Sequence, residues 1–133
     1  MQTLWAPWRM AYIGEPKTPG CIFCRARDAD DPRQHHVLTR EPALVMLNKY
    51  PYASGHIMVA PRQHTADLSE LSPADFHTLM TTLHHAAQQV QAAFAPEGMN
   101  IGMNLGVAGG AGVTDHMHWH IVPRWNGETN FMP

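Results

Sequence analysis

The sequence predicts an α+β domain in which an antiparallel sheet of about five strands carries one long helix packed on it. Three observations predict this fold class: a series of short extended segments, a single long amphipathic segment, and a stretch near the C-terminus where histidine alternates with apolar residues. The chain has 133 residues, 44% of them apolar, which suits one hydrophobic core. We therefore expect residues 1–133 to form a single domain, with residues 1–20 as an irregular N-terminal arm.

Five segments have the character of β-strands. Each is short, apolar or alternating, and punctuated by residues such as proline and glycine. The expected strands are residues 37–39, 43–47, 56–60, 99–104 and 117–122. The first three follow one another closely, as consecutive antiparallel strands do.

The long helix is expected to follow Ser72 and to end before Pro96. Ser72 can cap the helix, Pro73 suits its first position, and Asp75 places a carboxylate in its first turn. Apolar residues then recur at helical spacing and should face the core. This stripe comprises Phe76, Leu79, Met80, Leu83, Ala87, Val90 and Phe94. The polar face is expected to carry three solvated histidines, namely His77, His84 and His85.

Charge and composition narrow the function. The formal net charge of −2 leaves no broad basic face, so we expect no nucleic-acid partner. Ten histidines against nine lysines and arginines indicate chemistry, because histidine titrates, binds metals and attacks phosphorus near neutral pH. The first ten residues lack the pattern of an export signal, and no window approaches the ~18 apolar residues of a membrane span. We therefore expect a cytoplasmic protein without a membrane partner.

The histidine run is the strongest functional signal. Alternate residues of a strand lie on one side, so His116, His118 and His120 should share one surface while the apolar residues between them face the core. Residues 106–112, just before the run, include four glycines. Such a loop lets backbone N–H groups approach a ligand closely, although alone it could be a plain hairpin connection.

Imidazole chemistry suggests what the run does. A neutral imidazole attacks phosphorus near pH 7, and the resulting phosphoramidate is cleaved by a second acceptor. One ring nitrogen must hold its proton against a backbone carbonyl so that the other keeps its lone pair. The rival interpretation is a catalytic zinc bound by the three histidines. Side chains two apart on one strand rarely supply three ligands alone, and no HExxH pattern is present.

The only two cysteines, Cys21 and Cys24, form a C-x-x-C pair. In a chain without an export signal, this spacing favours a metal or redox pair over a structural disulfide. Two thiolates supply half of a tetrahedral zinc shell. The alternative is that the thiols are merely buried or redox-labile.

With its alternating histidines at 116–122, the sequence resembles the histidine triad (HIT) family, and the resemblance extends over nearly the whole chain. Further motifs that carry it lie at 21–24, 47–48, 55–64 and 122–125, and the glycine loop belongs to the pattern. The opening segment 5–9 and the closing segment 130–132 are similar to a microbial branch of diadenosine polyphosphate phosphorylases and hydrolases.

The resemblance implies a HIT-like fold and an enzyme, a nucleotidyl hydrolase or transferase. Its substrate would be a dinucleoside polyphosphate or a nucleoside phosphoramidate, cleaved at the α-phosphate through a covalent nucleotidyl-histidine intermediate. His118 matches the nucleophile, His120 the residue near the phosphate and the leaving oxygen, and His56 an additional active-site histidine. Substrate contacts are implied at Asn48 for the ribose, Asn104 for the phosphate, Gly112 and Thr114.

The resemblance also implies a metal and a partner. In zinc-containing relatives the ligands correspond to Cys21, Cys24, His64 and His116. A closed shell of this kind is structural, because it leaves no open position for catalysis. Family members form a two-fold homodimer by joining their sheets, which suggests a role near the partner's site for Trp125 and for residues 130–131.

One segment departs from the family pattern. Many members carry Gln followed by Ser or Thr shortly before the first histidine, whereas this chain reads Gly112, Val113, Thr114 and Asp115. Val113 donates no side-chain hydrogen bond, which leaves backbone amides and Thr114 for the phosphate. Nothing in the sequence explains an acidic Asp115 near an anionic substrate. Two alternative functions remain: a nucleotide-binding regulatory module with little turnover, and a small zinc-dependent binding protein.

Overall fold

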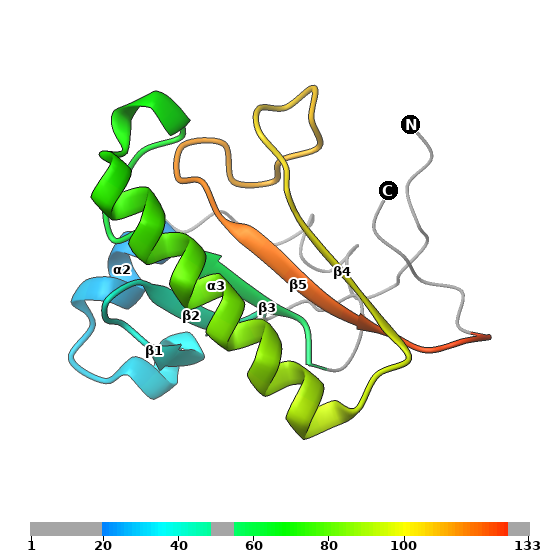
Figure 1. Cartoon of the computed structure of the whole chain (residues 1–133). Helices are drawn as coiled ribbons and strands as arrows, with labels where there is room; N and C mark the ends of the chain where they lie inside the picture. The colour runs from blue at the N-terminus through cyan, green and yellow to red at the C-terminus, as the bar shows by residue number, and fades with distance from the viewer. Residues whose placement is uncertain (1–19, 49–54, 128–133) are drawn as a thin grey trace.

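The structure, a computed structural model, describes residues 20–48 and 55–127 (Figure 1). Its centre is a sheet of five antiparallel strands in the order β1-β2-β3-β5-β4. The strands are β1 (Val37–Thr39), β2 (Leu44–Leu47), β3 (Ile57–Ala60), β4 (Gly98–Met103) and β5 (Trp119–Arg124). The predicted α+β fold class is confirmed. The expectation of an irregular arm over residues 1–20 falls almost entirely outside the described residues, as does the role suggested for residues 130–131.

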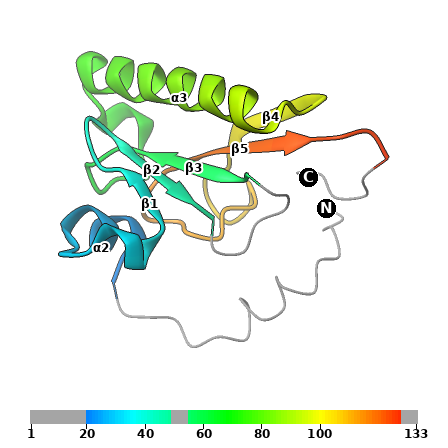
Figure 2. The same cartoon turned by 90° about the horizontal axis from the view of Figure 1, so that it is seen from below.

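Two helices cover opposite faces of the sheet (Figure 2). The long helix α3 (Pro73–Phe94) packs on one face, and the short helix α2 (Ile22–Asp28) lies on the other. Two 3₁₀ turns, η1 (Pro32–His35) and η2 (Leu68–Glu70), complete the described elements. Helix α2 was not predicted from the sequence, because seven residues are too few to show a helical apolar repeat.

Helix α3 begins and ends where the sequence predicts. The Ser72 hydroxyl accepts a hydrogen bond of 3.1 Å from the amide of Asp75. At the other end Ala95 adopts a left-handed conformation with φ 43°, and its N–H donates to the carbonyl of Gln91. Both contacts satisfy backbone groups that the end of a helix leaves without partners.

The predicted apolar stripe of α3 is correct in its middle and wrong at its two ends. Phe76 and Phe94 are 40% and 42% exposed. The buried line of the helix consists of Leu79, Thr82, Ala86 and Val90. Met80, Leu83 and Ala87 pack against the same core, whereas the rings at either end of the helix are not part of it. The three histidines of the polar face are exposed, as expected.

None of the helices in the described ranges is long and apolar enough to cross a membrane.

Candidate active site and metal centre

The histidine run lies at the start of β5, on the face of the sheet opposite α3. The strand begins only at Trp119, so the expectation that all three histidines belong to one strand is wrong. The reason is that the amide of Met117 donates to the carbonyl of Thr65, at 2.7 Å, and makes no sheet bond. The alternation nevertheless continues through this segment, because Met117 and Trp119 pack in the core beneath α3 while the histidines point the other way.

His118 is buried, with 6% of its surface exposed. Its Nδ1 lies 3.0 Å from the carbonyl oxygen of His116, a distance at which Nδ1–H donates to that oxygen. The lone pair of the neutral ring then resides on Nε2, which is the tautomer that nucleophilic attack requires. Burial lowers the pKa of His118, which keeps the ring neutral near pH 7. The Phe23 ring, 4.8 Å from the His118 ring, contributes to this burial.

Two further histidines lie beside His118. The His120 ring is 4.9 Å from the His118 ring, and His120 Nδ1 lies 2.9 Å from Nε2 of His56. The pairing of β3 with β5 produces this contact, because Met58 is opposite His120 and His56 directly precedes β3. The amide of Asn48, which follows β2, donates to the His56 carbonyl. His56 and His120 can therefore share a proton, whereas His118 meets His120 through a ring contact.

Asn104 directly follows β4, in which Gly102 pairs with His120. The ladder between β4 and β5 ends at the pair Met103 and Trp119, so the sheet register does not itself place Asn104 against His118. Gly112 and Thr114 are exposed in the loop that connects β4 to β5.

The glycine loop does not offer all its amides to a ligand. The N–H groups of Gly109 and Ala111 donate to the carbonyl of Gly106, and that of Gly110 donates to the carbonyl of Val107. A Cβ atom at Gly109 would lie 2.3 Å from the Leu105 carbonyl oxygen, so this tight turn requires glycine. The expectation that the glycines expose backbone donors therefore fails for residues 109–111, where the turn uses the donors itself. The end of the loop, at residues 112–114, lies outside this turn.

A second cluster lies on the far side of His116 from His118. One ligand atom from each of Cys21, Cys24, His64 and His116 lies within 4.8 Å of all the others, a group that could hold a metal ion. Nδ1 of His116 is 3.3 Å from the Cys21 sulfur and 3.7 Å from the Cys24 sulfur. Nδ1 of His64 is 3.3 Å from the Cys24 sulfur. The four residues named from the sequence therefore come together.

The geometry of this cluster fits a tetrahedral ion. Zinc with bonds of about 2.3 Å to sulfur and about 2.0 Å to nitrogen holds these ligands about 3.5 Å apart. The Nε2 of His116 lies 2.8 Å from the Pro61 carbonyl oxygen, which directs Nδ1 toward the thiols. Burial, and then the neighbouring Cys21, raise the pKa of Cys24. Two adjacent thiols of this kind ionise together only beside a cation that neutralises them.

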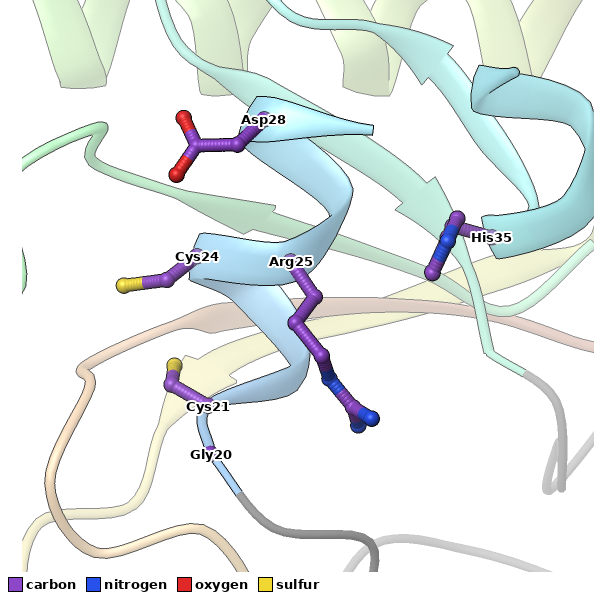
Figure 3. A pocket seen from close by; sticks show the side chains of 6 residues that line it. All are labelled: Gly20, Cys21, Cys24, Arg25, Asp28 and His35. Carbon is purple, nitrogen blue, oxygen red and sulfur yellow. The ribbon is translucent and has the colours of Figure 1, made fainter. Parts of the chain in front are cut away.

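A hollow of about 470 Å³ lies along α2, close to the thiols (Figure 3). Its lining comprises Gly20, Cys21, Cys24, Arg25, Asp28 and His35. In Figure 3 both sulfur atoms lie on one side of the helix, whereas Arg25 extends away from them. The hollow contains none of the triad histidines, so it belongs to the surroundings of the cysteine pair and not to His118.

The sequence did not predict the roles of two residues at the site, Phe23 and Val113. The Phe23 ring lies against both His116 and His118, at centroid distances of 5.0 and 4.8 Å. The position of Phe23 between Cys21 and Cys24 was the sequence signal that could have identified it. Val113, in the segment that departs from the family pattern, packs against the apolar cluster that includes Phe23. It anchors the loop by burial in place of a hydrogen bond.

A family model for the HIT domain matches residues 31–127, and the chain belongs to this family. Among curated relatives, the AP-4-A phosphorylase of Mycobacterium tuberculosis is 32% identical over 99% of this chain and 72% of its own length. The adenosine 5'-monophosphoramidase hnt1 of Schizosaccharomyces pombe is 34% identical over 81% of this chain and 77% of its own. The crystal structure of a Zn-bound histidine triad family protein from Mycobacterium smegmatis superposes with a TM-score of 0.71 and 28% identity, covering 84% of this chain and 80% of that one.

Proposed function

We propose that the protein is a nucleotidyl hydrolase or transferase that acts at the α-phosphorus of a dinucleoside polyphosphate or a nucleoside phosphoramidate. The observation that carries the proposal is the contact of 3.0 Å between Nδ1 of His118 and the His116 carbonyl, which leaves the nucleophilic lone pair on Nε2. Two relatives are named as a phosphorylase of AP-4-A and an adenosine 5'-monophosphoramidase, which supports this substrate class.

In the first step, Nε2 of His118 forms a bond to the α-phosphorus as the bond to the leaving group breaks. His120 gives a proton to the leaving oxygen or nitrogen, and His56, 2.9 Å away, shares the proton with it. In the second step, water or inorganic phosphate attacks the phosphorus, the P–N bond breaks, and its electron pair returns to Nε2. The acceptor's proton passes to His120, so the site is restored.

The substrate contacts are proposals of the same kind. Asn48 lies beside His56 through its backbone and is assigned to the ribose. Asn104, two residues after the strand partner of His120, is assigned to the phosphate. Gly112 and Thr114 lie in the loop segment whose amides the tight turn of residues 109–111 does not use, and we assign them to the phosphate oxygens.

The test is intact-mass spectrometry after brief mixing with diadenosine tetraphosphate, under conditions that preserve acid-labile adducts. We expect an adduct of one AMP group, and more of it in His120→Gly, because that variant lacks the group that accepts the proton of water or phosphate in the second step. The exposed α3 variant His85→Ala is the matched control and should behave as wild type. If neither an adduct nor turnover is found with this substrate or with an adenosine phosphoramidate, the regulatory binding module is the better description.

The metal centre is proposed to bind zinc. Cys21, Cys24, His64 and His116 would hold the ion, and the Zn-bound relative from Mycobacterium smegmatis supports the choice of metal. Four protein ligands close the shell, so the metal supplies no Lewis-acid chemistry to the substrate. Its contribution is a cross-link between α2 and the segment that carries His116, whose carbonyl orients His118.

We further propose that the protein forms a homodimer by joining two sheets at the edge strand β4. Among the described strands, β4 pairs only with β5, and its Ile101 is 45% exposed. We expect Ile101→Lys to convert the dimer into a monomer, because a charge would be buried at the interface. The matched control is Leu38→Lys on β1, the opposite edge strand, where Leu38 is 58% exposed.

Sedimentation velocity measures the outcome of this comparison. Wild type and Leu38→Lys should have the mass of two chains and Ile101→Lys that of one. A dimer lost only in Leu38→Lys would place the interface at β1 instead.

Two further proposals concern the whole chain. We place the protein in the cytoplasm, where nucleotide substrates occur and where thiols such as Cys21 and Cys24 stay reduced and able to bind metal. We also retain a single domain over residues 1–133 as a proposal, of which the family model covers 31–127.

A further inference from the structure

Asp115 is the residue whose acidic character the proposed reaction leaves unexplained. It stands at the end of the loop between β4 and β5, immediately before His116. In the structure its Oδ2 lies 3.7 Å from Nε2 of His64. The carboxylate therefore lies beside a proposed metal ligand, and this position offers a role other than substrate contact.

The orientation of the His64 ring suggests what the Asp115 carboxylate does. Nδ1 of His64 lies 3.3 Å from the Cys24 sulfur, so Nδ1 is the atom on the metal side. A neutral ring that binds a metal through Nδ1 carries its proton on Nε2. Nε2 is also the ring atom that lies 3.7 Å from Oδ2 of Asp115. A carboxylate that accepts the Nε2 proton holds the ring in this tautomer and makes Nδ1 a better ligand.

His116, the other proposed histidine ligand, has the same arrangement. Its Nδ1 lies 3.3 Å from the Cys21 sulfur, and its Nε2 lies 2.8 Å from the Pro61 carbonyl oxygen. Each histidine thus has an oxygen acceptor behind it, a carbonyl for His116 and a carboxylate for His64. Metal-binding histidines in proteins regularly have such outer acceptors.

The same loop segment is attached to the site at a second point. Val113, two residues before Asp115, packs against the apolar cluster that includes Phe23 of α2. Thr114, a proposed phosphate contact, lies between these two attachments. The loop end is therefore anchored by apolar packing at Val113, while the Asp115 carboxylate lies 3.7 Å from the His64 ring.

We propose that Asp115 is the outer-shell carboxylate of the metal centre and that it ties the substrate loop, residues 112–115, to the bound metal. The inference rests on the proposed zinc centre. Asp115 does not touch the metal; it positions His64, and the present separation of 3.7 Å closes to a hydrogen bond when Nδ1 is ligated.

The experiment is a competition between the protein and a chromogenic chelator for zinc. We expect Asp115→Ala to weaken zinc binding by about 10- to 100-fold, as loss of an outer-shell partner does elsewhere. Asp115→Asn keeps an oxygen acceptor without the charge and should fall between Asp115→Ala and wild type. The matched control is Asp30→Asn, which changes an exposed acidic residue outside the metal group and should bind zinc as wild type does.

Two further measurements separate a positioning role from a general structural one. The metal-free forms of wild type and Asp115→Ala should unfold at the same temperature, because the contact acts only through the metal-bound ring. In hydrogen exchange, zinc should slow the amides of residues 112–115 in wild type and have a much smaller effect in Asp115→Ala.

The outcomes are distinct. If wild type binds zinc and Asp115→Ala binds it equally well, the inference is overturned while the zinc centre stands. An equal weakening in Asp30→Asn would also overturn it, because the effect would then be one of net charge. If wild type binds no zinc, the proposed metal centre fails and this inference fails with it.

Discussion

Replacing His118 with alanine is expected to lower kcat by about 10⁴-fold or more and to abolish the nucleotidyl adduct. The physical reason is that the ring supplies the attacking lone pair on Nε2, which the contact of 3.0 Å between its Nδ1 and the His116 carbonyl makes available. Without it, water must attack the α-phosphorus directly. Steady-state hydrolysis of diadenosine tetraphosphate, followed by chromatography of the nucleotides, measures the change.

Two variants control for a folding defect. His118→Gly leaves a cavity in the buried site, and added imidazole should restore part of the turnover by occupying it. His85→Ala removes an exposed imidazole from α3 and should leave kcat unchanged. Turnover in His118→Ala close to that of wild type would exclude His118 as the nucleophile.

The second large effect concerns the metal. A zinc concentration about a thousand times the dissociation constant stabilises the folded protein by about 4 kcal/mol, so a strong chelator should lower the Tm of wild type by roughly 10–20 °C. The reason is that the Cys24 sulfur lies within 3.7 Å of Nδ1 of both His64 and His116, so the ion joins segments far apart in the chain. Calorimetry with and without chelator measures the shift.

Cys24→Ser should unfold at a lower temperature than wild type, and the chelator should leave its Tm unchanged. His77→Ala, which removes a histidine from the exposed face of α3, is the control and should respond to chelator as wild type does. The same chelator shift in Cys24→Ser would show that the metal binds elsewhere. A metal-free protein that remains folded should still form the adduct on His118, because the closed shell takes no part in the chemical steps.

Local signals in the sequence predicted much of the fold. The capping of α3 by Ser72 was predictable because it is a local interaction: the hydroxyl accepts from an amide in the first turn and does not depend on what the helix packs against. The five strands were found within two residues of their observed ends because period-2 alternation depends only on neighbouring residues. In the histidine run, the same alternation separated the imidazoles from Met117 and Trp119 correctly.

Other features depended on contacts distant in the chain. The amide of Met117 bonds to Thr65 across the molecule, which delays the start of β5 to Trp119. Phe76 is exposed although it continues the helical repeat, because the repeat alone does not determine which turns of α3 contact the sheet. Helix α2 was not predicted because it has only two buried apolar residues, Phe23 and Ala26, which are too few to show a helical repeat. Their burial becomes visible only in the folded structure.

The sequence by itself determined which chemical groups are present: the alternating imidazoles and the cysteine pair are read from residue type and spacing without knowledge of the fold. The grouping of His64 and His116 with the cysteines was implied by the family resemblance, and the structure brings the four residues together. Only the tertiary structure decided how the groups are oriented, because orientation arises where strands and loops far apart in sequence meet. The proton of His118 faces the His116 carbonyl, and the back of the His64 ring faces Asp115. Those two contacts connect the proposed nucleophile, the metal centre and the substrate loop.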